Sequence, residues 1–467
     1  MDEHATALDI AAAIRAMDVS PLEVLDACLE RVDQRNPDLN AVIWRNDEEA
    51  RAEARRLGDR IAVGVDDLPP FAGVPIPIKD LLPVAGQPVT YGSQGAPAGP
   101  SATSELMADL LAAAGFIFTG RTNTPEFGSI TVTENSRFGI TRNPWNPLHT
   151  SGGSSGGAGS AVASGMFPVA HASDGGGSIR IPASCCGLVG LKANRGRVPS
   201  TVPGWQGMVT EGALSRTVAD TAAVLDVISV PDPCAWFSAP QPERPFADEV
   251  GADPGRLRVA LCTVSALGLP VGDEPVAAVE HAGRLLEEAG HQVSTLSQDV
   301  FDPIGLIPFL NVINAGLSEM DGIDWDLVEP HNRAAHEAAK TVDSLTFASS
   351  LAELQRMTRQ IVARFDHEFD LLVTPTMSIE PPVVGLLSSV HNGAGGPVAE
   401  IVAMAAFTAI FNITGLPAIS LPLHQAASGL PVGVQIVAGP WREARLIRVA
   451  SHLEQADPWS ARHPRFN

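Results

Sequence analysis

Lysine, tyrosine and cysteine are all scarce in this chain. Its 467 residues include 31 basic side chains, but only Lys79, Lys192 and Lys340 are lysines. Where arginine replaces lysine almost everywhere, a retained lysine suggests a role that arginine cannot fill. A desolvated ammonium group can lose its proton, whereas a guanidinium cannot. Lys79 follows the apolar run 74–78, a setting that favours the neutral amine. We expect Lys192 to serve the structure.

Basic charge in general is low. The 53 acidic residues outnumber the basic ones and give a formal net charge of −22. This charge argues against binding to nucleic acid or to an anionic membrane surface. No apolar run reaches the roughly 18 residues that a membrane span needs, and residues 1–4 do not look like the start of a signal peptide. We therefore expect a cytoplasmic protein without a nucleic-acid or membrane partner.

The five cysteines do not suggest a disulfide framework, because their number is odd and Cys185 and Cys186 are adjacent. They are expected to be small buried residues in a reducing compartment. No group of cysteines and histidines has the spacing of a zinc site. His149 and His171 are expected to be loop or packing residues. The sequence thus predicts neither a metal nor an organic cofactor.

Glycine, in contrast, is concentrated in two serine-containing loops. Residues 152–157 read Gly-Gly-Ser-Ser-Gly-Gly and residues 174–180 read Asp-Gly-Gly-Gly-Ser-Ile-Arg, which places Ser154 and Ser178 24 residues apart. Such runs are often flexible linkers. They are not phosphate loops, because no Gly-Lys-Ser/Thr follows, and the glycine spacing fits a dinucleotide fingerprint poorly. A serine nucleophile needs a base, and a lysine that acts through a second serine can replace the usual histidine.

These residue types, in this order and setting, resemble the amidase signature family, whose catalytic triad is Ser-Ser-Lys. Further segments look like those of the family at 71–75, 121–127, 141–145, 411–418 and 430–435. Within the family, residues 178–184 and 434–438 look like the 6-aminohexanoate-cyclic-dimer hydrolase subgroup. One departure is Gly175, where threonine or isoleucine is common in the family. We expect it to affect the glycine loop rather than the triad.

The resemblance implies a role for each site residue. Ser178 would be the nucleophile, Ser154 the proton relay and Lys79 the base, and the Gly153–Ser154 peptide would be cis. Backbone amides stabilise the negative charge that develops on a carbonyl oxygen during amide hydrolysis. The predicted oxyanion hole consists of the backbone amides of Gly175, Gly176, Gly177 and Ser178. The nucleophile must lie beside this hole, which favours Ser178 over Ser154.

The predicted function is hydrolysis of a linear, cyclic or aryl carboxylic amide of small size through an acyl-serine intermediate. Two alternatives remain. The first is the amidase-like subunit of a tRNA-dependent amidotransferase, which typically has a tyrosine shortly after the Gly-Leu-Lys segment. This chain has Arg195-Gly196-Arg197 there, and its single tyrosine is Tyr91. The second is a non-catalytic binding relative, which the intact triad disfavours. A homodimer would be unsurprising.

The predicted fold is α/β. We expect one large domain, 1–467, with a mixed, mostly parallel twisted sheet covered by helices on both faces. N-terminal helices would occupy 5–60, the core that carries the family motifs about 69–228, and the remaining sheet and helical layer 250–467. Residues 301–345 lack a family motif, so they form either a peripheral helical layer or a lid that selects the substrate.

Two local patterns support this fold. Ser20-Pro21-Leu22-Glu23 is a capping box with proline at the first helical position, and it predicts a helix start. Strand-like runs at 257–262 and 293–296 flank a helical pattern that starts near Asp273 and ends at Gly290. This strand-helix-strand unit predicts a parallel pair joined by a right-handed crossover.

Overall fold

The computed structural model describes residues 2–64, 67–97, 99–265, 267–296, 306–391 and 398–466. Within these ranges no helix is long and apolar enough to cross a membrane. The predicted capping box is present at the start of α2 (Pro21–Leu39). Ser20 Oγ accepts a hydrogen bond from the Glu23 amide, and the Glu23 carboxylate accepts one from the Ser20 amide. Two backbone donors without helical partners are thereby satisfied.

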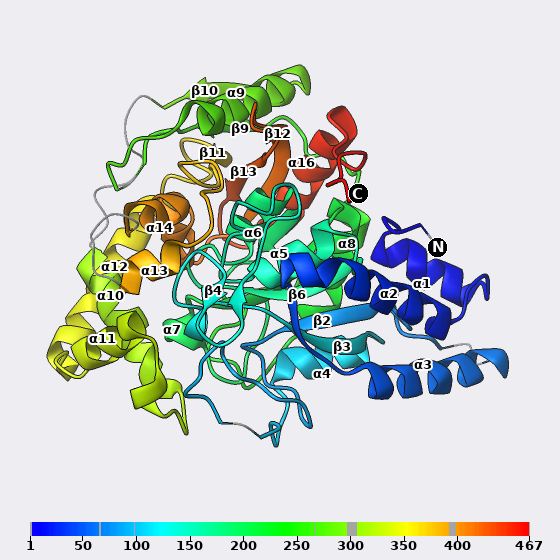
Figure 1. Cartoon of the computed structure of the whole chain (residues 1–467). Coiled ribbons are helices and arrows are strands. Elements are labelled where there is room, and N and C mark those ends of the chain that lie inside the picture. The colour runs from blue at the N-terminus through cyan, green and yellow to red at the C-terminus, as the bar shows by residue number, and fades with distance from the viewer. Residues whose placement is uncertain are drawn as a thin grey trace.

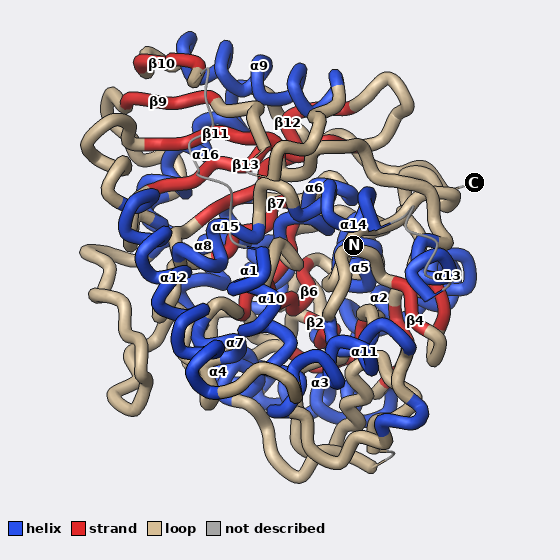
Figure 2. The backbone as a smooth tube through the Cα atoms, turned by 90° about the vertical axis from the view of Figure 1, so that its left-hand side faces the viewer, coloured by secondary structure: helices blue, strands red, loops and turns tan. Residues whose placement is uncertain are grey.

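An eight-stranded sheet runs through the centre of the molecule (Figure 2). Its spatial order is β10-β9-β11-β13-β12-β7-β8-β6. The strands are β6 (Val169–Asp174), β7 (Val189–Lys192), β8 (Thr210–Ser215), β9 (Arg258–Leu261), β10 (Gln292–Thr295), β11 (Leu371–Pro375), β12 (Ala418–Gln425) and β13 (Pro431–Ala438). Strands β6, β7, β11 and β13 are buried along their whole length, as expected for strands covered on both faces.

The predicted mixed α/β sheet is confirmed, but the expectation that most strand pairs are parallel is wrong. Parallel pairing is limited to β10–β9 and β9–β11. The other neighbouring pairs of this sheet run antiparallel. The predicted strand-helix-strand unit is the parallel pair β9–β10 with α9 (Asp273–Glu288) between its strands. Elsewhere, as in the turn 426–430 between β12 and β13, a short connection returns the chain directly and makes the pair antiparallel.

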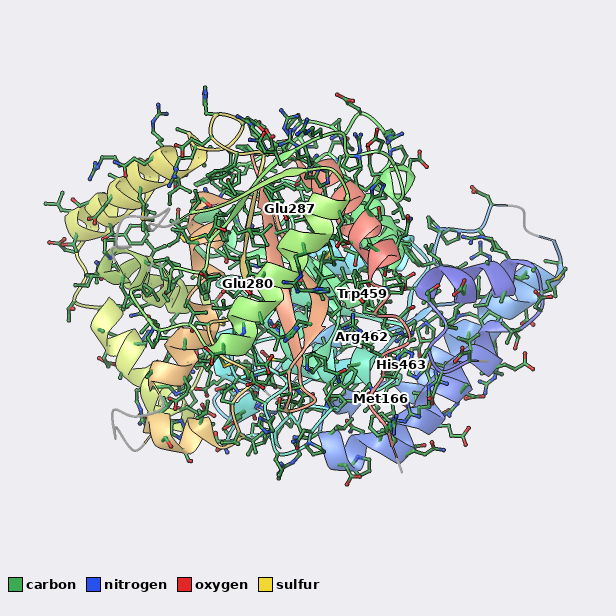
Figure 3. All side chains as sticks on the ribbon, turned by 90° about the horizontal axis from the view of Figure 1, so that it is seen from above. Met166, Glu280, Glu287, Trp459, Arg462 and His463 are labelled. Carbon is green, nitrogen blue, oxygen red and sulfur yellow. The ribbon has the colours of Figure 1, made fainter. Side chains whose placement is uncertain are left out.

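Helices cover both faces of the sheet (Figure 1). On one face lie α8 (Val218–Ile228), α9 and α16 (Glu443–Ala456), and on the other lie α5 (Gly156–Ala163) and α6 (Arg180–Cys186). In α9 the buried residues include Val279, Gly283 and Leu286, whereas Glu280 and Glu287 are exposed on its outer side (Figure 3). This separation follows the helical period of the sequence.

A smaller sheet carries the predicted lysine strand. Its order is β1-β3-β2, with β1 (Val42–Arg45), β2 (Pro75–Lys79) and β3 (Ile117–Thr122). Strand β2 lies beside β6 of the large sheet, where the Lys79 amide donates to His171 Nδ1 at 3.3 Å. The N-terminal and connecting elements around it are α1 (Ala7–Arg15), α3 (Asp47–Ala62), α4 (Leu106–Ala113), α7 (Gly204–Gly207), β4 (Glu134–Asn135) and β5 (Gly139–Ile140).

The end of the chain returns to its beginning. Trp459, Arg462 and His463 follow α16 in an irregular segment (Figure 3). Trp459 Nε1 donates to the carbonyl of Arg216 at 3.0 Å, and the ring of His463 stacks on that of His4 at 3.6 Å. These contacts attach the C-terminal segment to the residue that follows β8 and to the region in front of α1.

A layer of helices lies beside the sheet, on the left of Figure 1. It contains α10 (Leu306–Ala315), α11 (Pro330–Ala339), α12 (Ser344–Val362), α13 (Leu386–His391), α14 (Val398–Ala405) and α15 (Ala409–Thr414). The candidate lid 301–345 therefore contributes α10 and α11, while its residues 301–305 lie outside the described residues. Helix α10 packs against α12 and α11, as a helical layer would, and a lid role stays a prediction.

Candidate active site

Lys79, at the end of β2, is fully buried and bonded to a serine of the first glycine loop. Its Nζ lies 2.8 Å from Ser154 Oγ and 3.0 Å from Ser173 Oγ, with the carbonyl oxygen of Ser173 at 3.5 Å. The apolar residues that precede Lys79 in β2 are buried, and Lys79 at the end of the strand is buried with them. Lys79 and Ser154, both predicted site residues, are thus hydrogen-bonded, and Ser173 is a further partner that the sequence did not indicate.

The surroundings of Lys79 favour its neutral form. Burial lowers the pKa of Lys79 to about 7, although the more distant carboxylates Glu211 and Asp174 oppose this shift. The groups that bond to the amine, two hydroxyls and one carbonyl, are all uncharged. A buried ammonium without an adjacent counter-ion is costly, so the amine can give up its proton near neutral pH. Perturbed lysines of this kind are common at catalytic sites.

The first glycine loop places Ser154 between Lys79 and the second loop. The Gly153–Ser154 peptide is cis, as the resemblance implies. Directly after it, the Ser155 amide donates to the carbonyl of Ser178 at 3.3 Å, and Ser155 Oγ donates to the carbonyl of Ser173 at 3.2 Å. Ser155 therefore ties the two loops together. No hydrogen bond joins the hydroxyls of Ser154 and Ser178 within the described residues, and such bonds are often formed only with substrate bound.

The two serines differ in exposure. Ser154 has only 2% of its surface exposed, whereas Ser178 is partly exposed at the start of the turn that leads into α6. An attacking hydroxyl must be open to substrate, while a relay can be enclosed. The geometry thus supports Ser178 as the nucleophile and Ser154 as the relay.

An ion pair fixes the second glycine loop. Arg180 donates to Asp174 through Nε at 2.9 Å and through Nη2 at 2.8 Å. Its remaining donors bond to the Asn412 side chain, the Gln435 side chain and the carbonyl of Thr408. Burial opposes the charge of Asp174, but the attraction of Arg180 holds the pKa of that carboxyl far below its usual range. All five donors of the guanidinium are satisfied, which fits it for this buried position.

The Asp174 carboxylate also accepts a hydrogen bond from one of the four backbone amides predicted to form the oxyanion hole. Asp174 Oδ1 accepts the Gly177 amide at 2.7 Å, so this amide is committed to holding the loop. The amides of Gly175, Gly176 and Ser178 have no partner among the hydrogen bonds of the described residues. They are the remaining candidates for binding a carbonyl oxygen.

Gly177 has a structural role instead, because its position requires a residue without a side chain. Its φ is +132°, and a Cβ there would lie 2.3 Å from Thr408 Oγ1. Thr408 Oγ1 in turn donates to the carbonyl of Gly176 at 2.6 Å. A side chain at position 177 would therefore displace the contact that supports the loop.

Gly175, where the family often has a larger residue, packs against the side chain of Trp205. A Cβ at Gly175 would lie 2.5 Å from the indole ring of Trp205, so the tryptophan fills the space that a larger residue would need. The other side of that indole meets Gly316, where a Cβ would lie 2.5 Å from Trp205 Cδ1. Trp205 therefore links the glycine loop to the candidate lid region.

His171 and Glu211 complete the surroundings of Lys79. Because His171 Nδ1 accepts from the Lys79 amide, its Nε2 carries the proton and donates to Glu211 at 2.9 Å. His171 is thus a packing residue with satisfied nitrogens, as expected. The other buried lysine, Lys192, donates to the carbonyl of Ala193 at 2.9 Å and serves the structure, also as expected.

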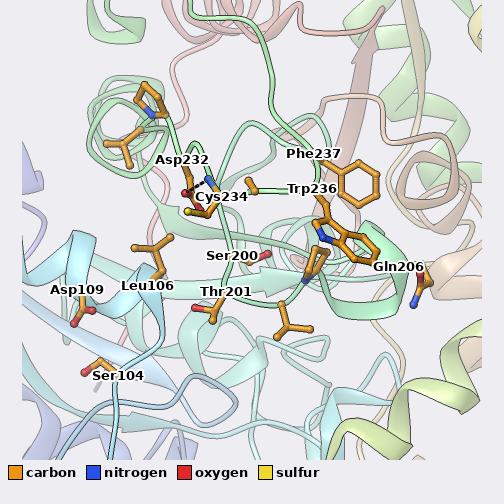
Figure 4. A pocket seen from close by; sticks show the side chains of 15 residues that line it. Ser104, Leu106, Asp109, Ser200, Thr201, Gln206, Asp232, Cys234, Trp236 and Phe237 are labelled. Carbon is orange, nitrogen blue, oxygen red and sulfur yellow. Dashed lines mark hydrogen bonds between the residues drawn. The ribbon is translucent and has the colours of Figure 1, made fainter.

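A large pocket of about 710 Å³ lies away from this site (Figure 4). Gln206, Cys234, Trp236 and Phe237 are among its lining residues, but none of the three triad residues is. The pocket is therefore separate from the candidate catalytic residues. Cys28, Cys185, Cys186 and Cys262 are buried, as expected from the sequence. Cys234 is exposed, so the expectation of burial is wrong for this cysteine.

Comparisons with known proteins agree on the class of protein. The sequence profile described as Amidase matches residues 23–447. A 6-aminohexanoate-cyclic-dimer hydrolase from Paenarthrobacter ureafaciens is 36% identical, over 97% of this chain and 95% of its own length. The structure of a 6-aminohexanoate cyclic dimer hydrolase complexed with substrate matches with a TM-score of 0.92 and 34% identity, over 100% of this chain and 99% of that one. A bacterial aryl acylamidase of the amidase signature family matches with a TM-score of 0.87 and 27% identity, over 98% and 97%.

We expect Arg180→Met to destabilise the protein by about 3–5 kcal/mol, because it leaves the Asp174 carboxylate buried without a counter-ion. Urea unfolding followed by circular dichroism measures the change. The matched control is Arg56→Met, which removes an exposed pair with Glu49. That variant should lose no more than about 1 kcal/mol. A similar small loss in both variants would show that the buried pair does not hold the loop.

Proposed function

This chain belongs to the amidase family and is an amidohydrolase of carbon–nitrogen bonds other than peptide bonds, and we propose that it works through an acyl-enzyme on Ser178. The observation that carries the proposal is the buried hydrogen bond between Lys79 Nζ and Ser154 Oγ, 2.8 Å long. This bond joins a base that can be neutral, Lys79, to an enclosed relay, Ser154. The more exposed hydroxyl of Ser178 is then the group that attacks.

In the first half-reaction, Ser178 Oγ attacks the carbonyl carbon of the amide. Its proton passes to Ser154 Oγ while the Ser154 proton passes to Lys79 Nζ. The amides of Gly175, Gly176 and Ser178 bind the oxygen that becomes negative. The tetrahedral intermediate then breaks its carbon–nitrogen bond. The relay returns the proton from Lys79 through Ser154 to the leaving nitrogen, which departs as an amine or ammonia.

In the second half-reaction, water attacks the ester formed on Ser178. The same relay removes a proton from the water and later protonates Ser178 Oγ, so that the carboxylic acid leaves and the enzyme is restored. Each proton transfer runs through the enclosed Ser154, where bulk water does not compete. Asp174 and Arg180 touch neither proton nor substrate in this scheme and only hold the loop in position.

The substrate we propose is a small linear, cyclic or aryl amide. Trp205 supports this class, because its half-buried indole lies directly against Gly175 beside the proposed oxyanion amides. Aromatic and apolar walls suit uncharged substrates of modest size. A screen of aliphatic amides, lactams, anilides and short oligoamides on the purified chain tests this proposal. Hydrolysis of none of these classes would contradict it.

The rate should rise with pH through about 7, where the depressed pKa of Lys79 places the transition from ammonium to amine. Below that pH the lysine is charged and cannot accept the relayed proton, so activity should fall. Lys79→Met should lose about 10²–10⁴-fold in kcat and keep its fold, as judged by circular dichroism. Lys340→Met removes an exposed lysine and is the control, with native rate and pH profile. Native activity in Lys79→Met would refute the role of the base.

Covalent labelling separates the two serines. A fluorophosphonate should add once per chain, to Ser178, because that hydroxyl is the exposed attacking group. Ser178→Ala should abolish labelling, and Ser154→Ala should slow it without moving the adduct. The exposed Ser388 offers a control, since Ser388→Ala should label like the native protein. Peptide mapping that finds the adduct on Ser154 would reverse the two roles.

Gly316→Ala tests whether the indole of Trp205 forms a wall of the substrate site. The added Cβ would come within 2.5 Å of Trp205, so the indole must move relative to Gly175. We expect kcat/KM for cyclic and aryl amides to fall about tenfold or more, and to fall less for small aliphatic amides. Gly58→Ala is the control, because a Cβ there would meet only Pro21 at 3.9 Å. Equal effects on all amide classes would show that Trp205 does not select the substrate.

A further inference from the structure

A second polar cluster joins α11 to α13, away from the triad. Glu329 directly precedes α11, His331 lies in its first turn, and His391 is the last residue of α13. The two helices are in contact and lie side by side in Figure 1. One potential ligand atom from each residue lies within 4.8 Å of the other two.

The three atoms that face one another are buried and have no hydrogen-bond partner within the described residues. They are Glu329 Oε2, His331 Nδ1 and His391 Nε2. The carboxylate oxygen lies 3.8 Å from the first nitrogen and 3.5 Å from the second. Buried polar atoms almost always have a partner. Three unpartnered atoms around one point therefore indicate that all three bind one common partner.

Hydrogen bonds from the other polar atoms of Glu329 and His331 orient these two side chains. Glu329 Oε1 accepts the Ser136 amide at 2.6 Å, which leaves Oε2 directed at the imidazoles. His331 Nε2 bonds to Ser129 Oγ at 3.2 Å. If Nε2 donates in this bond, Nδ1 presents its lone pair to Glu329. Bonds from the distal nitrogen commonly orient a histidine that ligates a metal.

We propose that Glu329, His331 and His391 bind a divalent first-row transition metal ion of the zinc type. Two imidazole nitrogens and one carboxylate oxygen form a donor set typical of zinc, with a fourth position left for water. Ligand distances of about 2.0–2.1 Å in a tetrahedral site put two ligands about 3.4 Å apart. The separations of 3.5 Å and 3.8 Å are close to this value, and the two histidine nitrogens lie within 4.8 Å of each other.

The ion would have a positioning role. It would connect α11, part of the candidate lid region, to α13. Ser129, the partner of His331, follows Gly128, where a Cβ would lie 3.2 Å from Ser154 Oγ. The ion would thus hold the helical layer beside the loop that borders the relay serine, while touching neither substrate nor the triad.

The test is zinc binding by the full chain, first stripped with a chelator and then followed by equilibrium dialysis with elemental analysis. We expect one tightly bound zinc ion per chain, and a cobalt-substituted protein with the visible absorption of a tetrahedral site. His331→Gln and His391→Gln should each weaken zinc binding tenfold or more, and Glu329→Gln should do the same. Zinc should raise the Tm of the native protein but not that of these variants.

The controls are His281→Gln and His424→Gln, each of which removes one histidine from a partly exposed histidine–carboxylate pair. They should bind zinc as the native chain does. Circular dichroism of the metal-free variants confirms that they are folded, and Glu329→Gln keeps an acceptor for the Ser136 amide if a histidine variant does not fold. Less than one ion per chain, or equal binding by native and cluster variants, would overturn the proposal. None of these readouts depends on amide hydrolysis.

Discussion

The ion pair between Asp174 and Arg180 is the interaction on which the site depends. It lies in the protein interior, and its two carboxylate oxygens also accept the amides of Gly177 and Ile179. Through Arg180 the loop is bonded to Asn412 in α15 and to Gln435 in β13, residues more than 200 positions away. A glycine-rich loop has high conformational entropy when unfolded, and this network restricts it to one geometry.

Beside that charged network lies an uncharged one. Lys79 donates to both Ser154 and Ser173, and no carboxylate is among its hydrogen-bond partners within the described residues. The separation matters, because a carboxylate at bonding distance would hold the lysine in its charged form. The buried ion pair therefore holds the backbone, while no carboxylate of the described residues lies at bonding distance from the Lys79 amine, which is the condition that the proposed proton transfer needs.

Besides the bonds of Arg180 to α15, two further links join the helical layer to this core. Trp205 reaches from Gly316 to the glycine loop, and the loop 126–136 reaches from Ser154 to the cluster of Glu329, His331 and His391. Glu126 adds a further link, since its carboxylate accepts the Glu329 amide and the Asn332 side chain. The helical layer is therefore fixed to this core by polar contacts as well as by packing.

The sequence alone indicated the family, the candidate residues Lys79, Ser154 and Ser178, and the local elements, because short-range patterns encode them. Ser20 and Glu23 lie within one helical turn, and the glycine loops are contiguous in the chain. Tertiary structure decided which strands pair, the bonding of Ser173 and Ser155 at the site, and the commitment of the Gly177 amide to Asp174. It also brought His391 to residues 60 positions earlier, a contact that no spacing rule predicts. Hydrogen bonds and ion pairs across such distances form only when the packed elements bring the groups together, so they leave no periodic signal in the sequence.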